Sequence, residues 1–241
     1  MNKKILFACL SVLVLCILGY LYISRGVDTL RVEVKNYSEK TDTFDIYVEY
    51  PQFPELPKAF NEKIKNTILE AEEGFKKESL ENEKARKETG RTNTSSGEYT
   101  FSTEWVPDQL NTNMVSFVIR AWHYTGGAHG GQTIYTFSYD LKKKKEVVLS
   151  DLFPNSPDYL ARISQYAIND LKLTLGKAGA ILPHMDMLQS GASPKEENFT
   201  LFTLSSQGSI TFYFSQYQVA PYVYGEQRVV IPLSFLLEKK N

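Results

Sequence analysis

The spacing of apolar residues changes several times along the chain, and each change predicts an element of secondary structure. In 43–53, every second residue from Phe44 to Tyr50 is apolar, which is the period of a half-buried β-strand. Further stretches are rich in the aromatic and β-branched residues typical of strands. They are 99–105, 114–122, 133–139, 147–149, 199–204, 209–214 and 227–231. A Ser-Ser-Gln-Gly turn between 199–204 and 209–214 predicts that these two strands form a hairpin.

Two other stretches have the period of an amphipathic helix. In 57–89, a stripe of apolar residues begins after Pro57, which suits a first helical turn, and Gly90 follows the predicted end. The second half of this helix has few apolar residues, so we expect it to extend into solvent. The other helix starts near Ser156-Pro157-Asp158 and closes at Gly176.

The order of these elements predicts an α+β fold with two units, each with one helix packed on an antiparallel β-sheet. We place the units at 28–140 and 141–241, preceded by a single transmembrane helix at 1–27. The chain lacks a glycine-rich phosphate loop after a strand and regular alternation of strand and helix, so a nucleotide-binding fold is disfavoured.

The predicted transmembrane helix is an uncharged run, 5–23, that follows Lys3 and Lys4. It is long enough to cross a bilayer and longer than the apolar region of most cleaved signal peptides. We interpret it as a signal anchor with the lysines in the cytoplasm. This predicts a single-pass protein of the bacterial cell membrane with an extracytoplasmic, periplasmic or cell-surface, domain. Cleavage after Gly26 and lipid attachment at Cys9 or Cys16 stay open as alternatives.

Composition narrows the range of functions for the predicted exported part. Both cysteines lie within 1–27, so we expect no disulfide, cysteine nucleophile or thiolate metal site beyond it. Residues 1–27 also hold three of the 27 basic residues and none of the 28 acidic ones, which leaves a formal net charge of −4. A mildly acidic surface makes nucleic acid an unlikely partner.

The loop 123–131 has the most informative composition, with four glycines and two histidines between two predicted strands. Glycine permits positive φ and close approach, and imidazole both donates and accepts hydrogen bonds. Together with the tyrosine-rich segment 217–225, this loop is predicted to form a ligand surface. The predicted ligand-binding residues are His123, Tyr124, Gly126, Gly127, His129, Tyr217, Tyr222 and Tyr224.

No catalytic residue, metal or cofactor is predicted. Zinc held by His123 and His129 is disfavoured, because two histidines alone are too few ligands. Acid–base chemistry by Asp140 and Asp151 would require their carboxylates to meet, and turn formation and helix capping explain both residues more simply. His184 is interpreted as a surface loop residue.

Four groups of residues together resemble a known family. They are Trp122-His-Tyr-Thr-Gly-Gly-Ala-His129, Phe137-Ser-Tyr-Asp140, Leu149-Ser-Asp-Leu-Phe153, and Tyr217-Gln-Val-Ala-Pro-Tyr222 followed by Gly225. Over about 34–237 the chain resembles the exported region shared by the lysozyme-binding anti-sigma factor RsiV and by the non-catalytic amino-terminal part of the peptidoglycan deacetylase PdaC. The resemblance makes 28–140 a PdaC-like unit and 141–241 a unit like the carboxyl-terminal region of RsiV.

The resemblance implies a non-catalytic, membrane-anchored module for binding or sensing, with lysozyme-like envelope proteins or peptidoglycan as ligands. Only four residues precede the predicted anchor, so we expect no segment able to hold a sigma factor, and no deacetylase domain is expected after 237. The alternative is a cell-wall hydrolase or deacetylase-type enzyme that uses the glycine-histidine loop.

Overall fold

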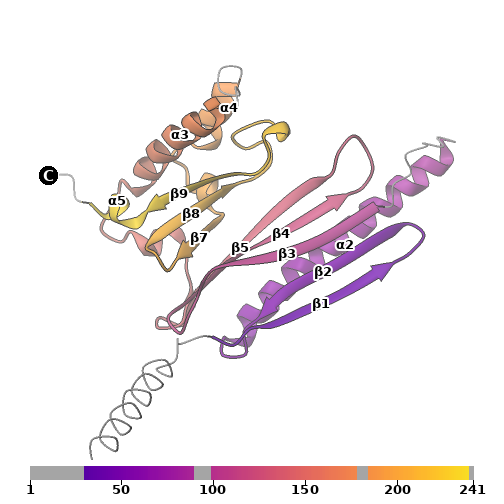
Figure 1. Cartoon of the computed structure of the whole chain (residues 1–241), viewed down its shortest axis with the longest axis horizontal. Coiled ribbons are helices and arrows are strands. Elements are labelled where there is room, and N and C mark those ends of the chain that lie inside the picture. Colours follow the sequence, from indigo (N-terminus) through magenta and orange to yellow (C-terminus); the bar gives the residue numbers. More distant parts are fainter. Residues whose placement is uncertain (1–29, 90–98, 178–183, 239–241) are drawn as a thin grey trace, which may run out of the picture.

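A computed structural model describes residues 30–89, 99–177 and 184–238 (Figure 1). A six-stranded sheet has the strand order of the sequence. Its strands are β1 (Glu33–Lys40), β2 (Phe44–Gln52), β3 (Tyr99–Leu110), β4 (Met114–Tyr124), β5 (Gly131–Asp140) and β6 (Lys145–Glu146). One long helix, α2 (Lys58–Glu88), covers a face of this sheet (Figure 1).

The six-stranded sheet is mixed, which corrects the prediction of purely antiparallel sheets. Strand β2 pairs with β3 in parallel, with Phe44 opposite Tyr99, and the other neighbours are antiparallel. The physical reason is the crossover through α2. A helix between two neighbouring strands returns the chain to the edge where the first strand began, so the second strand runs in the same direction.

The second sheet has three antiparallel strands, ordered β7-β8-β9. They are β7 (Phe202–Ser205), β8 (Ser209–Phe214) and β9 (Gln227–Pro232), so the predicted hairpin is confirmed. Around them lie α3 (Tyr159–Lys177), α4 (Met185–Gly191), α5 (Leu233–Leu237) and the short 3₁₀ helices η1 (Leu149–Leu152), η3 (Glu196–Phe199) and η4 (Tyr222–Tyr224). Two sheets with packed helices confirm the α+β class.

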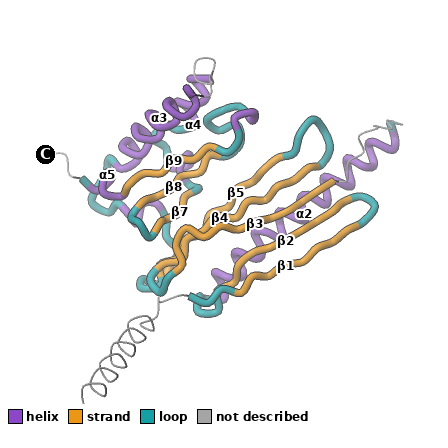
Figure 2. The backbone as a smooth tube through the Cα atoms, in the orientation of Figure 1, coloured by secondary structure: helices purple, strands orange, loops and turns teal. Residues whose placement is uncertain are grey.

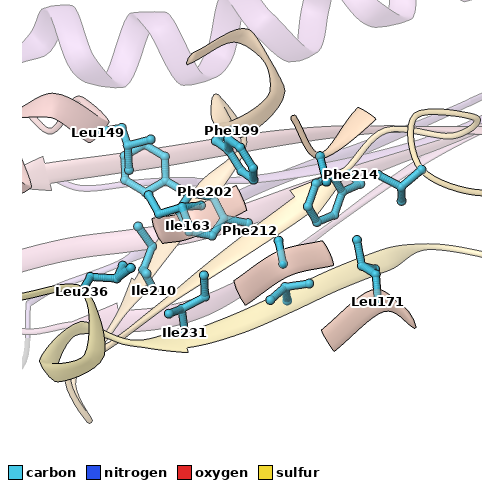
Figure 3. Close-up of a cluster of buried hydrophobic side chains, with 14 of the residues drawn as sticks. Leu149, Ile163, Leu171, Phe199, Phe202, Ile210, Phe212, Phe214, Ile231 and Leu236 are labelled. Carbon is cyan, nitrogen blue, oxygen red and sulfur yellow. The ribbon is translucent and has the colours of Figure 1, made fainter. Parts of the chain in front are cut away.

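Each helix stripe predicted from the sequence is buried in its own core. In α2, Phe60, Ile64 and Ile68 pack against the six-stranded sheet. In α3, Ile163, Ala167 and Leu171 pack against the three-stranded sheet (Figure 3). Full burial of a Phe, Ile or Leu side chain contributes about 1.5–3 kcal/mol, so each stripe stabilises the packing of its helix on its sheet.

Side-chain hydroxyls of the first sheet hold the free edge of the second. The backbone N–H of Leu204 donates to Ser116 Oγ (2.7 Å), and the N–H of Phe202 donates to Thr136 Oγ1 (3.2 Å). Ser116 Oγ also lies 2.7 Å from Ser138 Oγ. An unpaired strand edge is a liability in water, and these bonds satisfy the edge of β7 inside the molecule.

Helices that could cross a membrane are missing from 30–89, 99–177 and 184–238. This finding overturns the predicted single-pass localisation in the bacterial cell membrane. The longest described helix, α2, buries one apolar face and presents Lys and Glu on its outer side, whereas a membrane-spanning helix is apolar all round. The predicted anchor, 1–27, lies outside the described residues.

Candidate functional site

The glycine-rich loop joins β4 to β5 in a conformation that requires glycine. Gly126 has a φ of +95° and Gly127 a φ of +109°, a region that other residues rarely adopt. The hydroxyl of Tyr124 donates to the backbone oxygen of Gly127 (3.0 Å), which closes the tip of the loop. These glycines therefore fix the shape of the loop.

The outer half of α2 supports this loop. Asn82 Nδ2 donates to the backbone oxygen of Thr125 (2.7 Å), and Thr125 Oγ1 donates to Glu78 Oε1 (2.8 Å). Phe75 and Ser79, on the same part of the helix, are buried. Glu78 and Asn82 are nevertheless exposed, and Ser79 is the one buried residue of 76–88, so the prediction that the second half of α2 extends into solvent is confirmed. The sequence shows few apolar residues there, but it does not show that polar ones meet a loop.

The tyrosine-rich segment contains its own unusual backbone positions. Tyr217 has a φ of +64° and Gly225 a φ of +70°. Positive φ in a residue other than glycine costs on the order of 1–3 kcal/mol, and such residues cluster at ligand sites. The segment is held by Gln227, whose Nε2 donates to the backbone oxygens of Tyr224 (2.8 Å) and Gly225 (3.3 Å).

Figure 2 traces the backbone of the loop between β4 and β5 and of the segment between β8 and β9, and the two meet where His129 stacks on Tyr222. The rings of His129 and Tyr222 are stacked with centroids 3.9 Å apart and planes 15° apart. The ring of Tyr217 follows, with its centroid 6.3 Å from that of Tyr222 and the two planes 29° apart. We call His129, Tyr222 and Tyr217 the aromatic stack. The side chain of Tyr217 is 54% exposed, so one end of the stack faces solvent.

A bidentate ion pair beside the aromatic stack was not predicted. Arg120 Nε and Nη2 donate to the two carboxylate oxygens of Glu226 at 2.7 and 3.0 Å, and Gln132 Nε2 donates to the same carboxylate at 3.3 Å. The guanidinium also lies over the ring of Tyr213, 5.8 Å from its centroid. The bonds from Arg120 to Glu226 raise the pKa of the guanidinium above its usual value. The only feature of the sequence that could have indicated this ion pair is the position of Arg120 within a mostly apolar strand.

Trp122 extends the exposed aromatic surface. It lies two residues from Arg120 on β4, and residues two apart in a strand share a face of the sheet. Its side chain is 46% exposed, and Val223, within the tyrosine-rich segment, is 79% exposed. Large exposed apolar side chains gathered near one site are typical of interaction surfaces.

Two predicted site residues lie apart from the aromatic stack. Strand alternation points His123 to the α2 side, where it lines a cavity of about 140 Å³ with Glu78 and Tyr135. Tyr224 instead faces His184, with ring centroids 6.5 Å apart. The structure therefore does not pair His123 with His129. Within 30–89, 99–177 and 184–238, no group of three or more His, Cys, Asp or Glu side chains is placed to hold a metal ion.

Comparison with known proteins matches two family regions. The family described as "Deacetylase PdaC" covers residues 37–132, and the "Protein of unknown function (DUF3298)" family covers 150–234. The Peptidoglycan-N-acetylmuramic acid deacetylase PdaC of Bacillus subtilis (strain 168) is 30% identical over 205 residues, which are 85% of this chain and 41% of that protein. The chain thus spans less than half the length of this relative.

Two solved structures share the fold. A DUF3298 family protein from Pseudomonas aeruginosa PAO1 superposes with a TM-score of 0.60 over 88% of this chain and 94% of that one, at 16% identity. A member of the same family from Bacteroides fragilis also gives 0.60, over 87% and 93%, at 20% identity. At these identities the likeness concerns the fold alone.

Proposed function

We propose, given that the chain belongs to the family that shares the PdaC and DUF3298 regions, that it is a non-catalytic binding module. The observation that carries this proposal is the aromatic stack. Its rings come from both family regions, His129 from the first and Tyr217 and Tyr222 from the second. A ligand surface made from both regions explains why they occur together in one chain.

Peptidoglycan is the ligand that we favour. The relative that matches 85% of this chain is named as an enzyme acting on peptidoglycan. Sugar rings offer C–H faces that pack on aromatic rings, and hydroxyls that bond to polar groups at the rim. The aromatic stack supplies rings for the sugar faces, and the imidazole of His129 and the phenol of exposed Tyr217 supply polar groups for the sugar hydroxyls.

A lysozyme-like protein is the second candidate ligand, and the composition of the surface favours it. Trp and Tyr are enriched among the residues that dominate binding energy at protein interfaces. Here Trp122 and Tyr217 are about half exposed, and the apolar Val223, which follows Tyr222 in the chain, is 79% exposed. A protein ligand would cover these side chains together.

The enzyme alternative would use the glycine-histidine loop for hydrolysis or deacetylation. Such chemistry requires a base or metal ligands that converge on one substrate atom. His123 and His129 lie in different contacts, one lining the cavity beneath α2 and the other stacked on Tyr222. This separation supports binding rather than catalysis at the loop.

Three measurements on the full chain test the proposal. Sedimentation with insoluble purified peptidoglycan should carry the protein into the pellet in a saturable manner. Titration calorimetry with lysozyme tests the second ligand. Tight binding to lysozyme, together with no sedimentation with peptidoglycan, would identify a lysozyme-like protein as the ligand. Release of acetate from peptidoglycan by the chain would instead favour the enzyme alternative.

A further inference from the structure

Strand β5 has an open outer edge. Its neighbour β6 is only two residues long and pairs with Tyr139 and Asp140. One more bond follows, from the backbone N–H of Val147 to the oxygen of Ser138 (2.9 Å), before the chain turns into η1 at Leu149. In the part of the chain that the structure describes, no strand pairs with the rest of this edge.

The backbone of Thr136 faces the same open side. In an antiparallel pair, alternate residues direct both of their backbone groups to the same neighbour. Ser138 directs its C=O toward β6, so Thr136, two residues earlier, directs its N–H and C=O outward as well. The side chain of Thr136 stands on the face of the sheet toward β7, where it accepts the N–H of Phe202, and no described strand pairs with the Thr136 backbone on the open side.

A cavity of about 260 Å³ lies against this edge, where β6 stops. Its apolar lining comes from both units, with Phe137 from the first and Leu149, Phe199 and Phe202 from the second. The side chain of Val148 at its rim is 53% exposed. We call this cavity and the adjoining edge of β5 the β5 groove. It shares no residue with the aromatic stack.

The charged rim of the β5 groove is acidic. Lys63 and Glu146 form an ion pair with each other across the opening. Glu196, the first residue of η3, is exposed and forms no ion pair with a described residue. The rim thus keeps one unpaired carboxylate, which is complementary to a lysine or arginine of a ligand.

We propose that the β5 groove binds an extended peptide segment of a partner protein, with an apolar side chain and a basic one two residues apart, on the same face of the added strand. The segment adds to β5 as a strand and continues the line of β6, so that its backbone bonds to Thr136. Its apolar side chain enters the cavity, and its basic side chain meets Glu196. Strand addition to a sheet edge gives affinity through backbone bonds and specificity through such pockets, and β6 shows that this edge accepts a strand.

A random peptide library displayed on phage and selected against the full chain tests this inference. Selected peptides should share an apolar residue two positions from Lys or Arg. Synthetic versions should lose about tenfold or more in affinity when the backbone nitrogens next to the apolar residue are methylated, since methylation removes the donors of the strand bonds.

Matched variants locate the peptide. Glu196→Lys and Val148→Asp should each weaken binding about tenfold, because one reverses the rim charge and the other places a charge at the apolar mouth. Glu197→Lys changes the exposed next residue of η3, which does not line the cavity, and it should bind like the parent. Failure to select any peptide, or equal binding to all three variants and to methylated peptides, overturns the proposal.

Discussion

Arg120 and Glu226 join the two units of the protein through a bidentate ion pair at 2.7 and 3.0 Å. Arg120 lies on β4 of the six-stranded sheet, and Glu226 immediately precedes β9 of the three-stranded one. Their side chains are only 11% and 18% exposed. Because the planar guanidinium donates both bonds only when the carboxylate has one particular orientation, this pair fixes the position of the tyrosine-rich segment relative to the glycine-rich loop.

Loss of this ion pair should destabilise the fold. Glu226→Gln leaves a mostly buried guanidinium with only Glu104, 3.9 Å away and largely exposed, as a charged partner, and bonds to charged groups contribute about 1.5–3 kcal/mol. We expect the free energy of unfolding in urea to fall by about that amount. Glu88→Gln is the control, since Glu88 pairs with Lys84 at 4.0 Å on an exposed part of α2 and should lose less than about 0.5 kcal/mol. Equal losses would show that Arg120 and Glu226 do not hold the units together.

Backbone strain at the loop gives a second prediction. Gly127 has a φ of +109°, and an added Cβ would have no atom within 4 Å. Gly127→Ala thus introduces strain without a clash, and we expect a loss of about 1 kcal/mol. Gly74→Ala is the matched control, because Gly74 lies in α2 with equally free space around it. Alanine there should stabilise the helix by about 0.5–1 kcal/mol. Thermal unfolding that shows the same sign for both variants would contradict the assigned loop conformation.

Periodicity predicted both cores of this protein but not the direction of every strand. The stripes in α2 and α3 are visible in the sequence because burial selects one face of a helix. The parallel pairing of β2 with β3 is not visible in the sequence, because the alternation of apolar and polar residues is the same whichever direction a strand runs. Strand β1 escaped prediction because its residues are mainly polar and exposed at the edge of the sheet.

The candidate site was predictable in its segments more than in its contacts. Glycines and rings marked both 123–131 and 217–225, and their meeting through His129 and Tyr222 fits the prediction that they form one surface. The pairing of Arg120 with Glu226 joins residues far apart in the chain, which no local pattern encodes. His123 is not part of this surface, because the alternation of side chains along β4 continues up to the loop and directs the His123 side chain toward α2.

Tyr213 should make stability fall at alkaline pH. Burial raises the pKa of Tyr213 to about 12, and its hydroxyl donates to Asp108 Oδ2 at 3.1 Å. The pKa of tyrosine in an unfolded chain is about 10. The neutral phenol therefore stabilises the fold fully below about pH 10, and this contribution is lost as the pH rises toward 12.

The Tyr213→Phe variant isolates this effect. It has no proton to lose, so its free energy of unfolding should decline less than that of the parent between about pH 10 and 12, by on the order of 2 kcal/mol. Urea unfolding at several pH values measures the difference. Parallel pH profiles for the two proteins would show that Tyr213 is not buried in its neutral form.

Affinity for insoluble peptidoglycan, compared between Tyr217→Ala and Tyr47→Ala, tests the central claim most directly. Both tyrosines are about half exposed, but Tyr217 ends the aromatic stack and Tyr47 lies on β2. We predict that Tyr217→Ala weakens binding about tenfold or more, as expected when an aromatic contact residue is truncated, while Tyr47→Ala binds like the parent and both keep the parent's melting temperature within a few degrees. Equal affinity of the two variants would contradict the assignment of the aromatic stack as the ligand surface.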